Sequence, residues 1–408
     1  MLYDARAHAA RWTDDYLFNQ LIPYIGNKRK LLPLIGEAIA AAELGHGAHF
    51  VDLFAGSGVV SRFAKTLGFR VTANDWEPYA GAINGAHVAL DAAPDYRGRA
   101  YEEVIATLND LPPVEGWVTK HLCPDDDDNP DPARDRMFYL RRNGMRIDAI
   151  RAWIEDQRLE AGQRNALLAP LLYQACYVAN VSGVFKGFHR GWGGQTGTAL
   201  HRIKADLTLR PAIFHANGFA ARATAMDAAK LAGEAADFVY LDPPYNQHPY
   251  GSNYHVLNSI ALDDRPLLSA KIEGRGSKSA IRTDWRSERR SAYNHRGQAL
   301  AAYRALVGAI DARWIATSYS TDGNIAVADM VAACVARGDT SVFVQGYKRY
   351  RVSSQRMSPK PMNVEFVLLT DTAAPARTSA QDLVAAIEQA ERIALDAHPQ
   401  TASAIGRV

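Results

Sequence analysis

Short apolar runs alternate with helical patterns along most of the chain. Residues 49–53 (HFVDL) form an apolar run that stops at a glycine-rich turn, and residues 59–67 continue with helical spacing. A second apolar run, residues 69–73, ends at Asn74 and Asp75. A strand, a turn, a helix and another strand in this order are typical of a parallel sheet with helical crossovers.

The second half of the chain continues this alternation. Four further apolar segments are short enough to be strands: 236–241, 314–318, 340–345 and 364–369. The last two are typical of a hairpin pair. Three segments have the period of amphipathic helices, namely 299–310, 325–336 and 380–397. We therefore predict an α/β fold with one helix in the C-terminal tail.

The middle of the chain has a different character. An acidic stretch broken by prolines, residues 125–132, precedes two helical patterns over 146–158 and 163–179. Residues 180–197 are rich in glycine, aromatic and basic residues. This contrast predicts an inserted, mainly helical domain. The expected parts are a discontinuous catalytic domain, the insertion and a C-terminal helical tail, over residues 1–93 with 216–370, 94–215 and 371–408 respectively.

Composition narrows the class of protein. The chain has 408 residues, of which 48% are hydrophobic and 22% charged, values that exclude a disordered or fibrous protein. At about 150 residues per domain, this length predicts two packed units or one domain with an insertion. No apolar run approaches the ~18 residues of a membrane span. The first residues lack an apolar signal core, so we expect a cytoplasmic protein.

The charge distribution points to a polyanionic partner. The net charge is only +2, from 46 Lys and Arg against 44 Asp and Glu. Basic residues nevertheless gather in three blocks with few acids or none: 186–204, 271–296 and 346–361. Solvated loops would explain any one block as well as a binding surface would. Three blocks on a nearly neutral chain favour a surface that faces nucleic acid.

The turn from Asp52 to Gly58 (DLFAGSG) is a candidate cofactor loop. Gly56 and Gly58 let the backbone approach a ligand closely and expose the amide groups of the next helix to it. The turn lacks the third glycine of a dinucleotide fingerprint and the ending of a triphosphate loop, and a simple tight turn would also explain it. Asp75, about 20 residues on, can accept hydrogen bonds from ribose hydroxyls, although a turn or cap residue is the alternative. Trp76 can cover an adenine.

Asp242-Pro243-Pro244-Tyr245, directly after an apolar strand, is the sharpest motif in the chain. An exocyclic aromatic amine is a poor nucleophile because its lone pair is delocalised into the ring. The carboxylate of Asp242 and the carbonyl of Pro243 can both accept its N–H hydrogens and direct the lone pair at a methyl donor. The prolines fix the backbone at little entropic cost, and Tyr245 offers a face for an extruded base. A proline turn at the end of a strand is the alternative explanation.

Taken together, these motifs resemble the Dam-like, or alpha-class, adenine-specific DNA methyltransferases. The likeness rests on YIGNKRKLL (24–32), FVDLFAGSGVVS (50–61), the Asn74-Asp75 strand end, and DFVYLDPPY followed by NYHVLNSIA (253–261). It extends loosely from about residue 22 to residue 369. The resemblance implies a Rossmann-like, S-adenosyl-L-methionine-dependent core with a mixed seven-stranded sheet, and an inserted target-recognition domain.

The resemblance also implies roles for single residues. Asp242 to Tyr245 match the catalytic tetrad. The residues implied to bind the cofactor are Tyr24, Lys28, Asp52, Phe54, Gly56, Gly58, Asp75, Trp76, Asp227 and Asp242. Asp227 matches the family poorly, and helix capping explains it equally well. The tryptophan after Asp75, the long basic block 271–296 and the extra tail depart from the family pattern.

DNA contacts are implied mainly for the inserted domain. Aromatic and basic side chains of its glycine-rich segment can contact phosphates, intercalate or recognise guanine edges. The expected DNA-binding residues are Lys186, His189, Arg190, Trp192, Arg286, Arg289 and Arg290. A loop packed on its own domain is the alternative for the glycine-rich segment.

Several competing activities share parts of this pattern. A cytosine-C5 methyltransferase needs a Pro-Cys nucleophile, and none of Cys123, Cys176 and Cys334 follows a proline. The same cysteines are too far apart for a CxxC metal or redox site, which excludes zinc ribbons and zinc deaminases. Glutamine-directed methyltransferases generally carry Asn, and cytosine-N4 enzymes more often Ser, at the position of Asp242. A cytosine-N4 DNA methyltransferase, an RNA adenine methyltransferase and a DNA-binding module without turnover stay as alternatives.

We therefore expect a site-specific DNA adenine-N6 methyltransferase. It would transfer a methyl group from S-adenosyl-L-methionine to a flipped adenine in double-stranded DNA, without a metal. A restriction-modification or epigenetic role, a restriction endonuclease that acts separately, and a bacterial or phage-encoded, nucleoid-associated setting are expected from the same resemblance. The recognition sequence depends on loop geometry and is not predicted.

Overall fold

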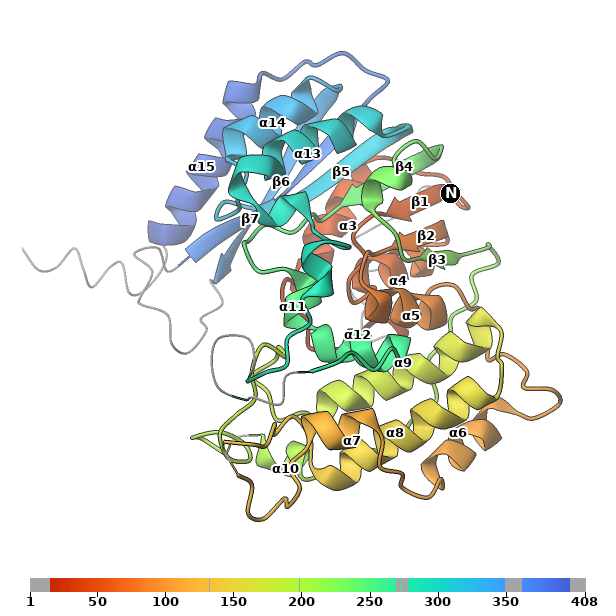
Figure 1. Ribbon diagram of the computed structural model, residues 1–408. Coiled ribbons are helices and arrows are strands. Elements are labelled where there is room, and N and C mark those ends of the chain that lie inside the picture. Colours follow the sequence, from red (N-terminus) through yellow and green to blue (C-terminus); the bar gives the residue numbers. More distant parts are fainter. Residues whose placement is uncertain are drawn as a thin grey trace, which may run out of the picture.

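A mixed β-sheet with helices on both faces adjoins a further layer of helices (Figure 1). The computed structural model describes residues 15–131, 133–197, 199–268, 272, 278–348 and 362–396. Within these residues the strands are β1 (His49–Asp52), β2 (Arg70–Asn74), β3 (Arg222–Thr224), β4 (Ala236–Leu241), β5 (Ala312–Ser320), β6 (Asp339–Lys348) and β7 (Met362–Asp371).

The order of strands in the sheet is β3-β2-β1-β4-β5-β7-β6. The strands from β3 to β5 in this order run parallel, whereas β7 is antiparallel to both β5 and β6. The mixed seven-stranded sheet confirms the predicted fold class, and the pairing of β6 with β7 confirms the predicted hairpin pair. Because β1 lies between β2 and β4, the carboxyl ends of these three strands meet at one edge.

Helices cover both faces of the sheet because alternate strand residues are apolar on each face. Phe50 of β1 belongs to the core under α3 and α4, whereas its neighbour Val51 belongs to the core under α13, α14 and α15. Phe238 and Val239 of β4 divide in the same way. These helices are α3 (Leu32–Ala41), α4 (Val59–Thr66), α13 (Arg296–Ala309), α14 (Val327–Val335) and α15 (Ala380–Asp396).

The second layer, drawn below the sheet in Figure 1, consists of the helices of the middle segment. They are α6 (Tyr101–Asn109), α7 (Trp117–Leu122), α8 (Arg141–Asp156), α9 (Ala161–Tyr177) and α10 (Leu200–Ile203). Between this layer and the sheet lie α5 (Pro78–His87), α11 (Tyr250–Asn253) and α12 (His255–Leu262). The remaining short helices are α2 (Asp15–Phe18), η1 (Lys28–Leu31), η2 (Ala228–Lys230), η3 (Asp284–Arg286) and η4 (Ala292–Asn294).

The helical layer shares a hydrophobic core with α5 and α12. Ile83 of α5 and Leu257 of α12 belong to the same buried cluster as Val104, Ile147 and Leu168 of the layer. The predicted helices at 146–158 and 163–179 are confirmed as α8 and α9, each of which begins a few residues earlier. The layer corresponds to the predicted insertion at 94–215, whose boundaries stay a prediction.

β3 and the tail helix show where the structure differs from the sequence-based expectations. β3 is not predicted from the sequence because its three residues, Arg222–Thr224, lack an apolar run and are exposed or half-buried. The predicted tail helix is confirmed as α15, but it is part of the core rather than an appendage. Leu383 and Ile387 of α15 are buried in the same cluster as Phe366 of β7. Residues 397–408 of the tail lie outside the described part of the chain.

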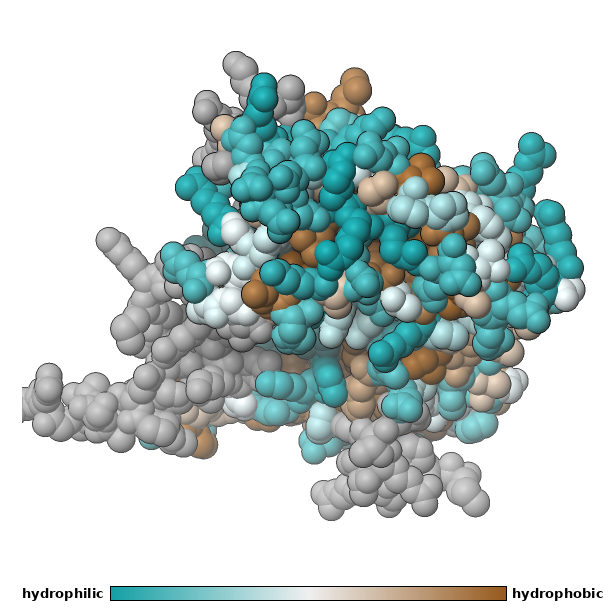
Figure 2. All heavy atoms as spheres, turned by 90° about the horizontal axis from the view of Figure 1, so that it is seen from below, coloured by the Kyte–Doolittle hydropathy of each residue, from teal (hydrophilic) through white to brown (hydrophobic). Residues whose placement is uncertain are grey.

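The face seen from below the helical layer is largely polar. Figure 2 shows its hydrophobic residues as separate patches between hydrophilic ones. In the described part of the chain, no helix has both the length and the apolar character that a membrane crossing requires.

Candidate active site

The predicted catalytic and cofactor residues meet at the carboxyl ends of β1, β2 and β4. Asp52 is the last residue of β1, Asp75 directly follows β2 and Asp242 directly follows β4. Asp52 is in register with Ala73 on one side and with Tyr240 on the other. Loops that follow neighbouring parallel strands converge at this edge, where open α/β sheets bind their ligands. The fold thus gathers three acids that are distant in the sequence.

The glycine turn between β1 and α4 uses backbone conformations that other residues rarely adopt. Gly56 and Gly58 have φ angles of 51° and 80°, in the left-handed region. A Cβ on Gly58 would lie 2.3 Å from Oδ1 of Asn84, and a Cβ on Gly56 would lie 2.8 Å from the ring of Tyr24. Glycine is required at both positions because the turn passes so close to these side chains.

Asp75 and Asp52 hold the backbone of this turn. Oδ2 of Asp75 accepts a hydrogen bond from Gly56 N at 2.8 Å, and Oδ1 accepts one from Glu77 N at 2.8 Å. Oδ2 of Asp52 accepts a hydrogen bond from Ser61 Oγ at 2.7 Å. A carboxylate offers about four lone-pair sites, so both acids retain capacity to accept hydrogen bonds from a ligand.

Burial changes the protonation of the acids at this edge. It raises the pKa of Asp52 to about 7, the pKa of Asp75 to about 6 and the pKa of Glu77 to about 7. Hydrogen bonds to each carboxylate lower these pKa values, but less than burial raises them. Several strongly shifted carboxyl groups in one place are typical of a functional site.

The N-terminal stretch around Tyr24 folds over the glycine turn. The Tyr24 ring stacks on the rings of Tyr250 and Tyr254, with centroids 5.0 and 5.1 Å apart. Ile25 N donates a hydrogen bond to Tyr254 Oη at 2.8 Å, and Ile25 O accepts one from Tyr250 Oη at 3.0 Å. Tyr250 and Tyr254 lie just after the catalytic motif, but their role was not predicted because only the folded chain places Tyr24 beside them.

The Asp-Pro-Pro-Tyr motif leaves β4 beside η1. The side chain of Asp242 is 17% exposed, and Nζ of Lys28 lies 3.0 Å from its Oδ1. The ring of Tyr245 is 5.5 Å from the same Nζ and meets the ring of Tyr319 edge to face at 6.1 Å. Burial raises the pKa of Asp242, and the charge of Lys28 opposes this increase. An acidic acceptor and an aromatic ring thus lie close together around one lysine.

Lys28 forms an ion pair with the carboxylate of Asp242. Burial lowers the pKa of Lys28, but the charges of Asp242 and Glu365 outweigh burial and hold this pKa well above its usual value. The ammonium group is therefore charged and is engaged with Asp242. A contact between Lys28 and a cofactor, which the resemblance implies, stays a prediction.

Two asparagines outside the motifs donate hydrogen bonds to the main chain of the loop that follows β4. This loop, residues 242–248, is called the catalytic loop below. Asn324 N donates a hydrogen bond to Tyr245 O at 2.9 Å, and Asn294 Nδ2 donates one to Asn246 O at 2.6 Å. Asn324 Nδ2 also donates to Tyr293 O at 3.0 Å. These residues were missed because each acts through a main-chain atom far away in the sequence.

The residues predicted to surround an adenine have separate environments. The ring of Phe54 meets that of Tyr293 edge to face, with centroids 5.5 Å apart, and Trp76 is half-buried. Asp227 precedes η2, where its Oδ1 accepts a hydrogen bond from Ala229 N at 3.0 Å. The capping explanation for Asp227 is confirmed, and its contact with a cofactor stays a prediction.

Asn180 organises the glycine-rich loop of the middle segment. Its buried side chain donates from Nδ2 to His189 O at 3.1 Å and accepts at Oδ1 from Gly193 N at 3.1 Å. Trp192 donates from Nε1 to Asp127 O at 2.8 Å. These hydrogen bonds hold the loop against its own layer. They thereby fix the main-chain positions from which its basic side chains extend.

Two basic side chains of this loop differ in position. Nζ of Lys186 lies 3.3 Å from Nδ1 of His248, just after the catalytic motif. Arg190 is exposed. Lys186 is therefore the basic residue of this loop that the fold places beside the catalytic loop.

The basic block 271–296 divides into paired and exposed arginines. Arg282 forms ion pairs with Asp264 and Asp284, both at 2.6 Å, and Arg289 lies 3.3 Å from Asp284 with its side chain 14% exposed. Arg286 and Arg290 are exposed and the better placed to meet a polyanion. Residues 269–271 and 273–277, and residues 349–361 of the third basic block, lie outside the described part of the chain.

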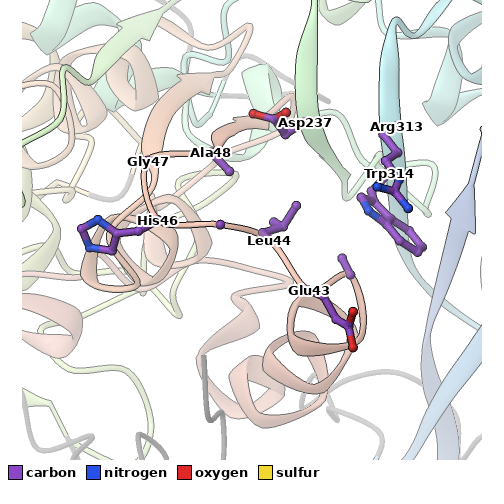
Figure 3. Close-up of a pocket in the computed structure, with 10 residues that line it drawn as sticks. Glu43, Leu44, His46, Gly47, Ala48, Asp237, Arg313 and Trp314 are labelled. Carbon is purple, nitrogen blue, oxygen red and sulfur yellow. The ribbon is translucent and has the colours of Figure 1, made fainter. Parts of the chain in front are cut away.

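A hollow of about 380 Å³ lies at the opposite, amino end of the parallel strands. Figure 3 shows Glu43, His46, Asp237, Arg313 and Trp314 around it. Asp237 accepts a hydrogen bond from His49 N at 2.7 Å, so its carboxylate supports the start of β1. None of the predicted site residues lines this hollow.

Metal-ligand geometry is absent from the part of the chain that the structure describes. No three His, Cys, Asp or Glu side chains there gather as metal ligands would. Cys123, Cys176 and Cys334 are each buried and free.

Comparison with known proteins agrees with this geometry. Residues 24–282 match the family described as D12 class N6 adenine-specific DNA methyltransferases. The chain is 30% identical over 358 residues to the type II methyltransferase M.NlaIII of Neisseria lactamica, covering 85% of this chain and 97% of that protein. It is also 30% identical over 338 residues to the type II methyltransferase M.CviAII of Paramecium bursaria Chlorella virus 1, covering 81% and 93%.

A longer relative shows the same similarity over part of its length. The modification methylase StsI of Streptococcus sanguinis is 27% identical over 318 residues, which cover 75% of this chain and 45% of that protein. The family match spans the glycine turn, the middle segment and the catalytic motif. It favours adenine N6 over the cytosine-N4 and RNA alternatives. The chain therefore belongs to the D12 class of N6 adenine-specific DNA methyltransferases, and its activity is site-specific methylation of adenine in DNA.

Proposed function

We propose that this methyltransferase takes its methyl group from S-adenosyl-L-methionine and transfers it directly to the N6 amine of an adenine that has left the DNA helix. The observation that carries the proposal is the position of Asp242. It lies at the same sheet edge as the glycine turn, and Lys28 lies near both Asp242 and the ring of Tyr245. An amine acceptor and a cofactor loop at one edge bring a donor and a base within reach of each other.

The residues at the sheet edge fit this cofactor. A Cβ on Gly56 would clash with the ring of Tyr24, so only glycine lets the main chain of the turn pass under this ring, beside the carboxylate of Asp75. Asp52 and Asp75 supply carboxylate acceptors suited to the ammonium and hydroxyl groups of S-adenosyl-L-methionine. When bound, the cofactor supplies a methyl group made electrophilic by its sulfonium. Trp76, Phe54 and the remaining predicted contacts are proposed on the same basis.

The protein's own groups would prepare the adenine amine. Asp242 and the carbonyl of Pro243 accept the two N–H hydrogens, which directs the nitrogen lone pair toward the methyl donor. Pro243 and Pro244 hold that carbonyl in place. Tyr245 stacks against the displaced base. Lys28 keeps Asp242 ionised although it is largely buried.

DNA recognition is proposed for the segment 94–215. Lys186, His189, Arg190 and Trp192 lie in its glycine-rich loop, and the contact of Lys186 with His248 places this loop beside the catalytic loop. Arg286 and Arg290 would meet the phosphate backbone of double-stranded DNA. Arg289, engaged with Asp284, would contribute mainly by holding this segment in place.

The test is methyl transfer followed by nucleoside analysis. The protein is incubated with methyl-labelled S-adenosyl-L-methionine and duplex DNA, and with RNA as a competing acceptor. The proposal expects N6-methyldeoxyadenosine in digested DNA, and calorimetric binding of S-adenosylhomocysteine to the free protein. Absence of binding would exclude this cofactor, and label in N4-methyldeoxycytidine would contradict adenine as the acceptor.

Base displacement is tested by fluorescence. A duplex with 2-aminopurine at the target adenine should become more fluorescent when the enzyme binds, because the displaced base loses its stacked neighbours. Unchanged fluorescence at saturating enzyme would contradict the proposal.

A role beside a separate restriction endonuclease is also proposed. Its support is that both relatives covered over more than nine-tenths of their length are named type II methyltransferases. DNA from cells that express this chain should become resistant to one site-specific endonuclease, and methylation-sensitive sequencing should identify the site. Methylation at many unrelated sequences would contradict this role.

A further inference from the structure

A second buried acid shares the lysine that holds the catalytic aspartate. Nζ of Lys28 lies 3.0 Å from Oδ1 of Asp242 and 3.9 Å from Oε2 of Glu365. The three side chains are 4%, 17% and 10% exposed. Two carboxylates and one ammonium group are thus withdrawn from water at the point where the amine is expected to react.

Glu365 reaches this position from an element that no motif marks. It lies on β7, in register with Ser320, the last residue of β5. Within the described residues, its Oε2 accepts no hydrogen bond. Burying a carboxylate costs several kcal/mol unless ion pairs and hydrogen bonds compensate, and a distance of 3.9 Å from Lys28 compensates only in part. Lys28 and a hydrogen bond with Ser320 lower the pKa of Glu365, but less than burial raises it, and such an acid beside a proposed catalytic group calls for a functional explanation.

The arithmetic of charge supplies that explanation. An ion pair of Lys28 with Asp242 alone would have no net charge, and all hydrogen bonds of the ammonium group would be available to that one carboxylate. A second carboxylate competes for the same ammonium and leaves the group of three with a net negative charge. The adenine nitrogen becomes positive as it takes the methyl group, so an Asp242 carboxylate that Lys28 engages only in part stabilises the transition state more than the ground state.

We propose that Glu365 is a positioning residue that shares Lys28 with Asp242 and so keeps the carboxylate of Asp242 available to the adenine amine. The inference rests on the proposed role of Asp242 and extends it to a strand that the sequence motifs do not include. It requires Glu365 to be ionised while the enzyme works.

The pH dependence follows from the same contacts. Burial raises the pKa of Asp242 and the pKa of Glu365, whereas Lys28 lowers both. Removing the charge of Glu365 leaves Lys28 to Asp242 alone, which lowers the pKa of Asp242. The other titratable groups around the three residues are Asp52, Tyr240, Tyr245, Tyr250, Tyr319 and Asp322. All of them are unchanged in the test variant.

The test is Glu365→Gln, which keeps the shape of the side chain and mimics its protonated form. Single-turnover methylation of duplex DNA is measured from pH 5.5 to 9, together with the KM for DNA and binding of S-adenosylhomocysteine. We expect kcat to fall about tenfold, with KM and cofactor binding within about twofold of the wild type. The acidic limb of the rate profile should move to lower pH.

Three further variants separate positioning from folding. Glu365→Asp keeps the charge and should leave the acidic limb where the wild type has it. Glu391→Gln removes an acid that accepts a hydrogen bond from Thr321 at 3.1 Å, away from Lys28, and should change neither rate nor profile. In a Lys28→Gln background, Glu365→Gln should cause no further loss, because Glu365 acts through Lys28.

The outcomes that would overturn the inference are specific. Wild-type rates in Glu365→Gln would show that Glu365 is neutral in the working enzyme. A lower rate with an unmoved acidic limb, or an equal loss in the Lys28→Gln background, would show a merely structural role. A wild-type enzyme that methylates no adenine would overturn the proposed function as well, so the two failures are distinguishable.

Discussion

Asp242 is the residue on which the proposed chemistry depends most. It is bonded to Lys28, and Lys28 also has Glu365 nearby. Removing the carboxylate of Asp242 therefore leaves the buried ammonium with a partner. We therefore expect the fold to survive a change that removes this proposed acceptor of the amine hydrogens.

We predict that Asp242→Ala lowers the methylation rate about 10³-fold, the scale of losing a preorganised polar group in an active site. Binding of S-adenosylhomocysteine should stay within a few-fold of the wild type. Asp339→Asn is the control, because Asp339 pairs with Arg377 on the surface. Radiolabel transfer measures the rate, and near-normal turnover would sink the catalytic assignment.

Glu77 is a second residue whose environment leads to a testable expectation, here for the pH dependence of stability. Its carboxylate accepts a hydrogen bond from Asn258 Nδ2 at 2.6 Å, and burial raises its pKa to about 7 from the usual 4.5. The unfolded chain loses this proton near pH 4.5, whereas the folded protein keeps it until about pH 7. The contribution of Glu77 to stability is therefore greatest below pH 4.5 and declines as the pH rises to 7.

Glu77→Gln should remove this decline. The amide oxygen can still accept from Asn258 but carries no charge, so the variant should gain roughly 3 kcal/mol over the wild type between pH 4.5 and pH 8. Denaturant unfolding at the two pH values measures the difference. Glu288→Gln, a change at an exposed position, is the control. An equal difference at both pH values would contradict the shifted pKa.

At the scale of elements, the basic block 278–296 acts partly on the protein itself. Arg282 and Arg289 are engaged with acids of the chain, and Asn294 fastens the catalytic loop. Counting basic residues along the sequence overestimates the charge that this block presents to DNA. Arg286, Arg290 and Arg296 of this block are exposed.

The double variant Arg286→Gln/Arg290→Gln should weaken DNA binding and flatten its salt dependence. Each lost phosphate contact should reduce the slope of log affinity against log salt by roughly 0.9. Arg313→Gln, at the opposite end of the sheet, is the matched control. Fluorescence anisotropy at several salt concentrations measures both quantities, and an unchanged slope would count against this surface.

At the scale of the whole molecule, the helical layer of the middle segment and the layer that carries the candidate active site are not independent. Their common core includes Ile83 of α5 and Leu257 of α12 together with Val104, Ile147 and Leu168 of the helical layer. Excision of residues 94–215 would expose this apolar surface to water. The two layers therefore stabilise each other, which keeps the glycine-rich loop at a set position relative to the loop that follows β4.

We predict that the isolated segment 94–215 does not fold cooperatively. Circular dichroism should show helical content without a sharp thermal transition, whereas the full chain should unfold in a cooperative step. A cooperative transition in the fragment, together with dispersed amide resonances, would establish an independent domain.

The sequence by itself determined the local elements and the chemical motifs. Apolar runs such as 236–241, and helical periods such as 163–179, are signals contained within one segment. The glycines of the turn and Asp242 to Tyr245 are equally local, because each motif needs its neighbours for its own geometry. Short elements gave weaker signals: β3, with three residues and no apolar run, was not predicted, nor were the helices α5, α6 and α12.

The tertiary structure alone decided which groups act together. Glu365 reaches Lys28, Asn324 reaches Tyr245 and Tyr250 reaches Ile25 across large separations along the chain. Side-chain partners of this kind depend on strand order and on how loops converge at one sheet edge, and neither quantity is encoded in a short window of residues. Folding also pairs Arg282 and Arg289, which the sequence presents as part of a basic surface, with acidic side chains. Only the folded structure shows which acids these arginines contact.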